Sequence, residues 1–278
     1  MSMTQEIVLM WTAVSVYAAG SVLLSVGFVF AKERLLRLGA WVSIAGLLPH
    51  LAATAVRWVR VGHGPYLGFY EVVSGLAIST VVLYGLIAWR YPKLAPTGVI
   101  LMPISFITLA AAMFAPKSAM EVTGKLASWW LTIHVAFAKL SYAAFIAGFV
   151  LGIVYLLRER GYGERMADVL AKLPSQAVVD DLEFRFVAVG FIFLGVMIAA
   201  GAVWANEAWG RYWSWDPIET WSLISWIVYA AYLHLRLTLG WKGTRSAWVA
   251  VLALPVVVFA LIGVPLVYSS IHGAYLTG

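Results

Sequence analysis

Eight long apolar runs constrain this chain more than any other feature of its sequence. Each is about 20 residues or longer, the length at which a helix can cross the hydrocarbon core of a membrane. They lie at 7–31, 37–58, 68–90, 95–115, 129–157, 184–204, 217–239 and 246–268. Because 63% of the 278 residues are hydrophobic and only 12% are charged, the chain lies outside the range of soluble domains. We expect an all-α integral membrane protein with about eight transmembrane helices, short loops and a single polytopic membrane domain over 1–278.

The distribution of Lys and Arg predicts the orientation of these spans, because basic loops face the cytoplasm. With the amino terminus outside, the inward loops hold thirteen basic residues and the outward segments hold five. The inward residues are Lys32, Arg34, Arg37, Arg90, Lys93, Arg158, Arg160, Arg165, Lys172, Arg185, Arg236, Lys242 and Arg245. We therefore expect both termini, and the connection between the sixth and seventh spans, to be extracytoplasmic. The first run lacks a basic leading segment and a cleavage site, so it is expected to be a retained span.

A tryptophan-rich segment at 204–226 occupies that sixth connection and the start of the seventh span. Six of the fourteen tryptophans lie in these twenty-three residues, together with Tyr212. They are Trp204, Trp209, Trp213, Trp215, Trp221 and Trp226. Large flat aromatic surfaces of this kind suit a flat ligand. The alternative is an aromatic belt at the membrane interface, which any membrane protein can carry.

Within this segment Asp216-Pro217-Ile218-Glu219 is a helix-start signal, with Asp at the N-cap, Pro at the first helical position and Glu three residues after the cap. A helix is predicted from Pro217, and the preceding residues are predicted to be a loop or a short surface helix. Asp216 would then position the aromatic surface without touching a ligand. Arg211 is a candidate partner for a ligand carboxylate, since Arg pairs with carboxylates in a fork geometry, although ordinary solvation explains it equally well.

The run WGRYWSWDPIETWSLISWIVYAAYLHLR resembles the tryptophan-rich WWD signature of haem-handling proteins. Among them it is most similar to the CcsA/ResC type, the integral-membrane half of the system II cytochrome c synthetase. The resemblance extends to His50, Gly62-His63, Tyr70-Glu71, His134 and His272. It implies a protein of an inner, cytoplasmic or thylakoid-type membrane that binds haem b as its substrate.

Two histidines are expected at the outer face, level with the tryptophan-rich segment. His134 lies a few residues into the fifth span and His272 just beyond the eighth. A neutral imidazole is the usual protein ligand of haem iron, so the pair would form a bis-His site covered by the aromatic surface. A single histidine of this kind is more often a hydrogen-bonded structural residue. The resemblance matches both residues to the external haem ligands of the family.

Two further histidines, His50 and His234, lie inside spans, where ionisable residues are costly and often functional. The resemblance implies that this pair binds haem iron within the membrane. Their predicted depths differ by several residues, and a kink in the second span, where His50 follows Pro49, would reconcile them.

Three more ionisable residues are harder to assign. His63 lies in the Gly62–Pro65 loop, where we expect it to be solvated. Glu71 begins the third span, where a carboxylate also suits the positive end of a helix. Lys139 lies about 15 Å into the fifth span at 1.5 Å per residue, so we expect it to face a water-filled cavity or a haem propionate.

Haem delivery to the outer face and haem attachment to the CXXCH motif of apocytochrome c are the functions that the resemblance implies. The chain has no Cys, so the thioether sulfurs must come from the substrate. The family acts with a second membrane protein, CcsB/ResB (Ccs1), and we expect surrounding lipid but no nucleic acid as further partners. The alternatives are a haem exporter or chaperone without ligation activity, and a di-haem electron-transfer cytochrome.

Overall fold

The computed structural model describes residues 2–119, 122, 124–160 and 169–269, and it is an all-α bundle in which these residues form no strand. The α-helices are α1 Met3–Val29, α2 Glu33–Ala45, α3 Leu47–Val61, α4 Phe69–Arg90, α5 Gly98–Met113, α6 Trp129–Arg160, α8 Gln176–Trp209, α9 Pro217–Leu237, α10 Thr244–Val258 and α11 Val264–Val267. Short helices occur at η1 Pro92–Thr97, η2 Gly124–Leu126 and η3 Phe259–Gly263. The expectation of an all-α membrane protein is thus confirmed.

Seven helical segments of the described chain are long and apolar enough to cross a membrane. They are Met3–Val29, Glu33–Val61, Phe69–Arg90, Pro92–Met113, Trp129–Arg160, Gln176–Trp209 and Thr244–Val267. The expected count of eight is therefore not confirmed, because α9 is not among them. It is nevertheless 21 residues long and packs against α8 and α10.

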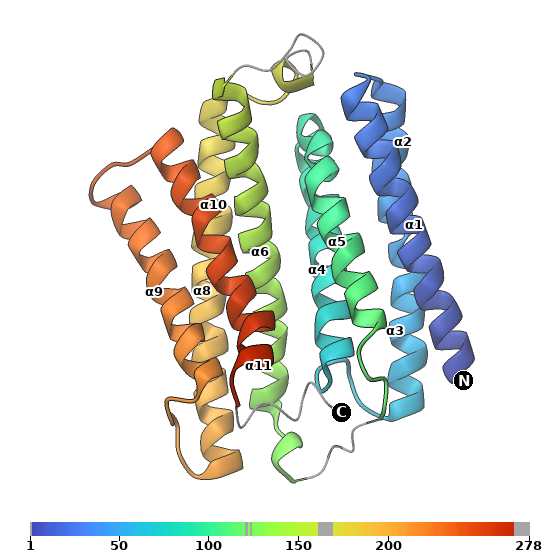
Figure 1. Cartoon of the computed structure of the whole chain (residues 1–278), viewed down its shortest axis with the longest axis vertical. Coiled ribbons are helices and arrows are strands. Elements are labelled where there is room, and N and C mark those ends of the chain that lie inside the picture. Colours follow the sequence, from blue (N-terminus) through green and yellow to red (C-terminus); the bar gives the residue numbers. More distant parts are fainter. Residues whose placement is uncertain (1, 120–121, 123, 161–168, 270–278) are drawn as a thin grey trace.

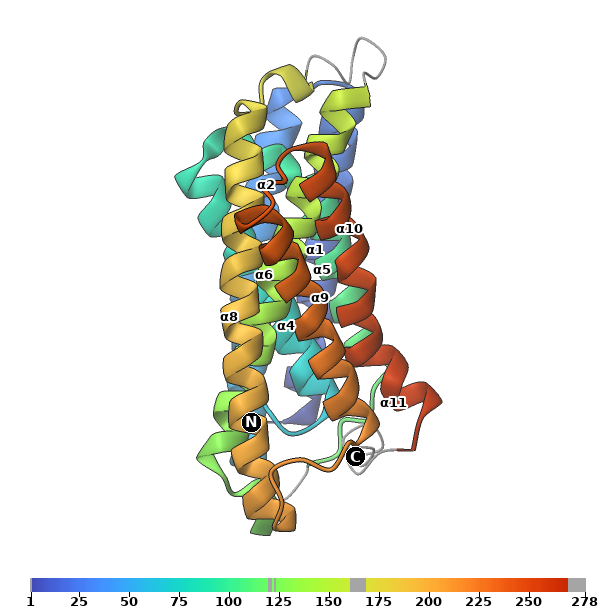
Figure 2. The same ribbon diagram turned by 90° about the vertical axis from the view of Figure 1, so that its left-hand side faces the viewer.

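The helices run roughly antiparallel in two groups, α1 to α5 and α6 to α11, with α6 beside α4 at the junction (Figure 1). The loops 62–68 and 210–216 and the short helix η2 lie at one end of the molecule. Figure 2 shows the end of α8 and the start of α9 meeting at that same end. The alternation of loops expected from the sequence is therefore present.

The second span is interrupted at Gly46, where α2 ends and α3 begins. Pro49 lacks the amide hydrogen that would bond back to residue 45, so a regular helix cannot continue through this point. A Cβ on Gly46 would lie 2.6 Å from ring atoms of Tyr17, so glycine also allows α1 to approach closely. The second span is therefore interrupted three residues before Pro49.

Close packing of α6 on α8 forms the centre of the second helix group, α6 to α11. A Cβ on Gly190 would lie 2.6 Å from the ring of Phe145. The same Phe145 ring stacks on Tyr229 of α9, with centroids 3.6 Å apart. This packing fixes the position of α8 relative to α6, and both helices contribute to the site described below.

A buried ion-pair cluster secures the loops of the first group at the end where 62–68 lies. The Arg57 guanidinium lies 2.6 Å from Glu71 and 3.3 Å from Glu6, and all three side chains are buried. Glu71 also accepts a hydrogen bond from the Leu67 amide at 3.0 Å. Buried charges of this kind persist only when paired and hydrogen-bonded, so Glu71 has a structural role in holding the loop before α4.

Candidate functional site

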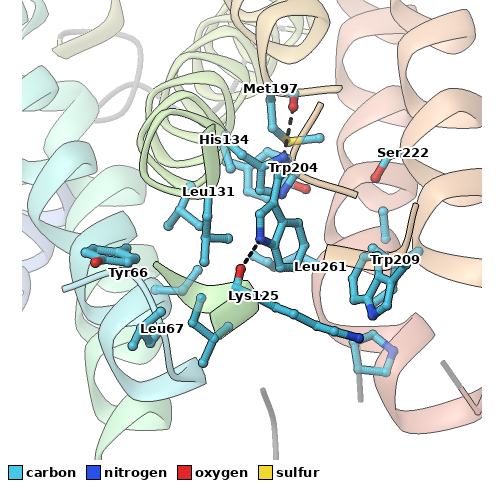
Figure 3. A pocket seen from close by; sticks show the side chains of 18 residues that line it. Tyr66, Leu67, Lys125, Leu131, His134, Met197, Trp204, Trp209, Ser222 and Leu261 are labelled. Atoms are coloured by element: carbon cyan, nitrogen blue, oxygen red, sulfur yellow. Dashed lines mark hydrogen bonds between the residues drawn. The ribbon is translucent and has the colours of Figure 1, made fainter. Parts of the chain in front are cut away.

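A cavity of about 330 Å³ opens at the end of the molecule that carries the loops 62–68 and 210–216. It lies between the start of α4, η2, α6, α8, the start of α9 and the η3–α11 region. Its walls are mainly apolar, as is typical of small-molecule sites. The lining residues include Tyr66, Leu67, Lys125, Leu131, His134, Met197, Trp204, Trp209, Ser222 and Leu261 (Figure 3). Two of the expected tryptophans and one expected histidine are therefore brought together around one cavity.

His134 lies near the start of α6 and is held by α8. Its Nδ1 donates a hydrogen bond to the Met197 carbonyl oxygen, 2.8 Å away. Because a carbonyl can only accept, Nδ1 must carry the proton, and in the neutral ring Nε2 then carries the lone pair. A hydrogen bond from one ring nitrogen to a backbone carbonyl is the arrangement that orients metal-binding histidines. His134 is thus in the tautomer that can coordinate iron through Nε2.

Gly201 makes this position of the imidazole possible. It lies one turn after Met197 on α8, and a Cβ placed on it would be 2.5 Å from the Nδ1 atom of His134. Any side chain at residue 201 would therefore push the ring away from the Met197 carbonyl. This role could not be predicted from the sequence, since a glycine in an apolar helix has no pattern that distinguishes it.

Trp204 and Trp209 form the aromatic wall next to His134. The Trp204 ring is buried, and its Nε1 donates to the Lys125 carbonyl at 2.8 Å. Its centroid is 6.5 Å from that of His134 and 4.9 Å from that of Trp209. The Lys125 ammonium lies 5.9 Å from the Trp209 ring centroid, so a cation stands beside the aromatic wall.

The remaining tryptophans do not join this wall in a single surface. Trp213 lines a smaller adjoining cavity of about 40 Å³ that also contacts His134. Trp215 is 70% exposed and adopts a positive φ of 59°. Trp221 packs on Phe259, and Trp226 stacks on Phe191, with centroids 4.6 and 4.8 Å apart.

The division of the tryptophans follows from where the helices end. The sequence predicted a loop or short helix before Asp216, but α8 continues to Trp209, and only 210–216 form the loop. Trp204 and Trp209 therefore lie on a helix that faces the cavity. Trp221 and Trp226 lie inside α9 and contact neighbouring helices, which is how core aromatic residues behave.

The predicted start of α9 is confirmed. Asp216 is the N-cap, with Oδ1 accepting from the Ile218 amide at 3.0 Å, and Glu219 completes the capping box. Glu219 also accepts from the Ser214 amide at 2.8 Å, which ties the preceding loop to the helix. Arg211 is exposed in that loop at the same end of the molecule as the cavity.

The other histidines are placed apart from His134. His50 is completely buried, with Nδ1 3.1 Å from the Tyr17 hydroxyl and Nε2 2.8 Å from Ser74 Oγ. His234 is exposed on α9, on the far side of the bundle from α3 (Figure 1). The structure therefore does not bring His50 and His234 together, even with the kink in the second span. His272 lies outside the described residues.

His63 is not solvated as the loop sequence suggested. Its side chain is buried, and Nδ1 donates to the Gly64 carbonyl at 2.8 Å. It is covered because Glu71, 4.0 Å from Nδ1, folds the 62–67 loop back onto the start of α4. A short loop rich in glycine gives no indication of such burial.

The fold and this cavity define a polytopic membrane protein with an aromatic-walled site suited to a flat, largely apolar ligand that an imidazole can contact. Comparison with known proteins agrees. The family described as cytochrome C assembly protein matches residues 66–272. The chain belongs to this family, as a CcsA-type cytochrome c biogenesis protein.

Three proteins illustrate the similarity. The chain is 39% identical over 259 residues to cytochrome c biogenesis protein CcsA of Synechococcus sp. (strain CC9605), covering 83% of this chain and 84% of the relative. It is 34% identical over 268 residues to the CcsA protein of Guillardia theta, with 88% of each chain covered. A solved structure of the cytochrome c haem lyase CcmF has the same fold, with a TM-score of 0.70 and 20% identity over 99% of this chain. The chain spans about half (49%) of that structure's length.

Proposed function

We propose that this protein carries haem b to the outer face of the membrane and holds it there for covalent attachment to the CXXCH motif of apocytochrome c. The observation that carries the proposal is His134, whose tautomer is fixed by the Met197 carbonyl at the wall of an aromatic cavity. The comparisons support a role in cytochrome c maturation, since the relatives are cytochrome c biogenesis proteins.

The residues around the cavity fit a haem. Trp204 and Trp209 offer flat apolar faces, and His134 offers Nε2 as one axial ligand. Lys125 beside the aromatic wall, and Arg211 in the adjoining loop, are the cations available for the propionates. We propose His272 as the second axial ligand. The proposal does not use His50 and His234 as a pair, because they lie on separate parts of the bundle.

The contribution of this chain to attachment is positioning. Two axial imidazoles shield the iron until the histidine of the CXXCH motif replaces one of them, which brings the two thiols to the vinyl groups. Each thiol then adds across a vinyl double bond, so that a carbon–sulfur bond forms and the thiol proton moves to the neighbouring carbon. This addition needs no oxidant, and no general acid or base is required from this chain.

The orientation and the partner belong to the same proposal. The end of the molecule that carries the cavity would face away from the cytoplasm, together with the loops 62–68 and 210–216. Both termini would lie on the same side of the membrane. A second membrane protein of the ResB/CcsB (Ccs1) type would act with this chain in the system II pathway. The predicted excess of basic residues in the opposite loops supports this orientation.

Reconstitution tests the proposal. A bacterial host without its own cytochrome c maturation proteins would express this chain, the ResB-type partner and a reporter apocytochrome with one CXXCH motif. We expect haem that stays on the reporter through a denaturing gel, and none when either membrane protein is absent. Haem-loaded membrane protein without reporter product would instead indicate the exporter or chaperone. Reversible redox steps from permanently bound haem would indicate the di-haem cytochrome.

A further inference from the structure

A second and larger cavity lies beside the first, and Tyr66 lines both. Its volume is about 760 Å³, and it is bounded by the end of α3, the 62–66 loop, α4 and the first turns of α6. His63 and Lys139 contribute polar atoms to its lining, while Trp58 and Trp129 contribute aromatic surface. None of these four side chains takes part in the site proposed above.

Lys139 brings a positive charge into this cavity without a matching negative charge. Its ammonium donates to the Pro65 carbonyl at 2.5 Å, and no carboxylate of the described chain lies within ion-pair distance of it. Glu71 is already engaged by Arg57 at 2.6 Å and by the Leu67 amide at 3.0 Å. A cation inside a spanning helix is costly unless it is paired, so the cavity favours an anion.

The surrounding helix leaves room for this cation. Gly75 of α4 lies against the Lys139 side chain, and a Cβ on it would be 2.7 Å from the ammonium nitrogen. The Lys139 side chain can therefore run along α4 towards Pro65 only because residue 75 is glycine. The packing of α4 on α6 at Gly75 therefore determines where the Lys139 ammonium lies.

His63 adds a buried polar atom that has no hydrogen-bond partner among the described residues. The residue is only 5% exposed, and its Nδ1 is used by the Gly64 carbonyl. Its Nε2 is buried and has no hydrogen-bond partner in the part of the chain that the structure describes. Because Nδ1 carries the proton, Nε2 of the neutral ring is an acceptor. Leaving such a buried atom unpaired is costly, so a ligand group that donates a hydrogen bond here would remove that cost.

The rim of the cavity is apolar and faces outward. Trp58 and Trp129 are 56% and 83% exposed, and Leu140 is 45% exposed. Trp residues concentrate where a membrane meets water. A ligand of this cavity therefore meets charge at one end and exposed apolar surface at the other.

We propose that this cavity binds the oxyanion head of an amphipathic molecule, with the Lys139 ammonium as its counter-ion and the Trp58–Trp129 rim against the apolar part. Two sources share this chemistry, the phosphate of an anionic phospholipid and the propionate of a haem. A head group that also carries a hydroxyl can donate to His63 Nε2. The proposal does not rest on the function of the His134 cavity, because the phospholipid source needs no haem.

The test uses the full chain purified in detergent, as wild type and as Lys139→Met, Lys139→Arg and Lys93→Met. Methionine keeps the length of the side chain without its charge, and Lys93 is an exposed lysine at the other end of the bundle. Phosphatidylglycerol binding, measured by native mass spectrometry, is expected to weaken about tenfold or more in Lys139→Met. Lys139→Arg and Lys93→Met should bind within about twofold of wild type, since both keep the charge at residue 139.

A second arm tests haem as the source. Haemin and haemin dimethyl ester, which has no free propionate, are titrated by tryptophan fluorescence into the same variants in wild-type and His134→Ala backgrounds. If a propionate is the ligand, Lys139→Met weakens haemin binding about tenfold in both backgrounds, and esterification has the same effect on wild type. If neither phosphatidylglycerol nor haemin distinguishes Lys139→Met from wild type or from Lys93→Met, the proposal is overturned. That result would leave the effect of His134→Ala itself, and hence the proposed function, unaffected.

Discussion

His134 obtains its orientation from two features of one helix, the Met197 carbonyl and the missing Cβ at Gly201. The hydrogen bond selects the tautomer, and the glycine gives the ring room to form it. Neither feature is a ligand, yet both decide whether Nε2 can face the cavity. A change at Gly201 should therefore affect haem binding without touching the haem.

We predict that Gly201→Ala displaces the His134 ring, because the added carbon would lie 2.5 Å from Nδ1. The expected result is a haem absorption spectrum that is weakened and shifted as in His134→Ala, while the protein elutes as a single species on size exclusion. Gly85→Ala is the matched control, since its Cβ would lie at an ordinary 3.7 Å from Ile44. A wild-type spectrum for Gly201→Ala would show that the ring does not need this space.

At the residue level, the sequence predicts best what depends on near neighbours. The cap at Asp216 was predictable, since the motif Asp-Pro-Ile-Glu contains all of its partners within four residues. The burial of His63 was not, because it depends on Glu71 and Arg57, which come from α4 and α3. His134 was predictable as a candidate ligand, but its contact with Met197 needed the packing of α6 on α8.

The start of α9 is the element that joins the tryptophan-rich loop to the bundle. Asp216 caps the helix, and Glu219 holds Ser214 of the loop through its carboxylate. Since both interactions are local, the loop and the helix start should be disturbed together.

We predict that Asp216→Ala destabilises this region by about 1 kcal/mol, the usual cost of losing an N-cap, whereas Asp216→Asn, which caps almost equally well, does not. Thermal unfolding and haem binding of the purified variants check this. If Asn proves as damaging as Ala, Asp216 acts through its charge and not through the cap.

The contact between α6 and α8 leaves no room for an added carbon at Gly190, so we predict that Gly190→Ala is destabilising. Gly190→Ala would place a carbon 2.6 Å from the Phe145 ring, and overpacking of this kind typically costs about 1–3 kcal/mol. The expected result is a lower melting temperature in detergent, with Gly85→Ala unchanged. Equal melting temperatures would mean that the α6–α8 contact adapts without cost.

The apolar runs predicted the helices well but not all of their ends. α8 continues five residues past the predicted end at 204, and both Trp204 and Trp209 line the cavity. This extension divides the tryptophans between α8, the loop and α9, so the six do not form one surface. Hydropathy cannot detect the difference, since a tryptophan has the same hydropathy value whether it faces a cavity or lies in a loop.

For the whole molecule, the sequence predicted the alternation of loops, and the structure places 62–68, 210–216 and η2 at one end (Figure 1). The separation of His50 from His234 depends on the packing of two helix groups, which hydrophobic periodicity does not specify. The side of the membrane that this end faces is a prediction from the basic residues alone.

The absence of cysteine allows that orientation to be measured directly. Tyr212→Cys, in the loop after α8, should react with a membrane-impermeant maleimide added outside intact cells. Lys242→Cys, at the opposite end, should react only after the membrane is permeabilised. The reverse pattern would place the cavity on the cytoplasmic side and contradict the proposed delivery to the outer face.

If His134 holds haem iron through Nε2, the absorption spectrum of the purified protein must depend on this residue. The variants are His134→Ala and His272→Ala, with His50→Ala as the control for a buried histidine outside the cavity. We predict a bis-His haem spectrum in wild type and His50→Ala, its loss in both outer variants, and its return on addition of imidazole. An unchanged spectrum in His134→Ala would show that this imidazole does not hold the iron, and would leave the tryptophan-rich segment as an aromatic belt.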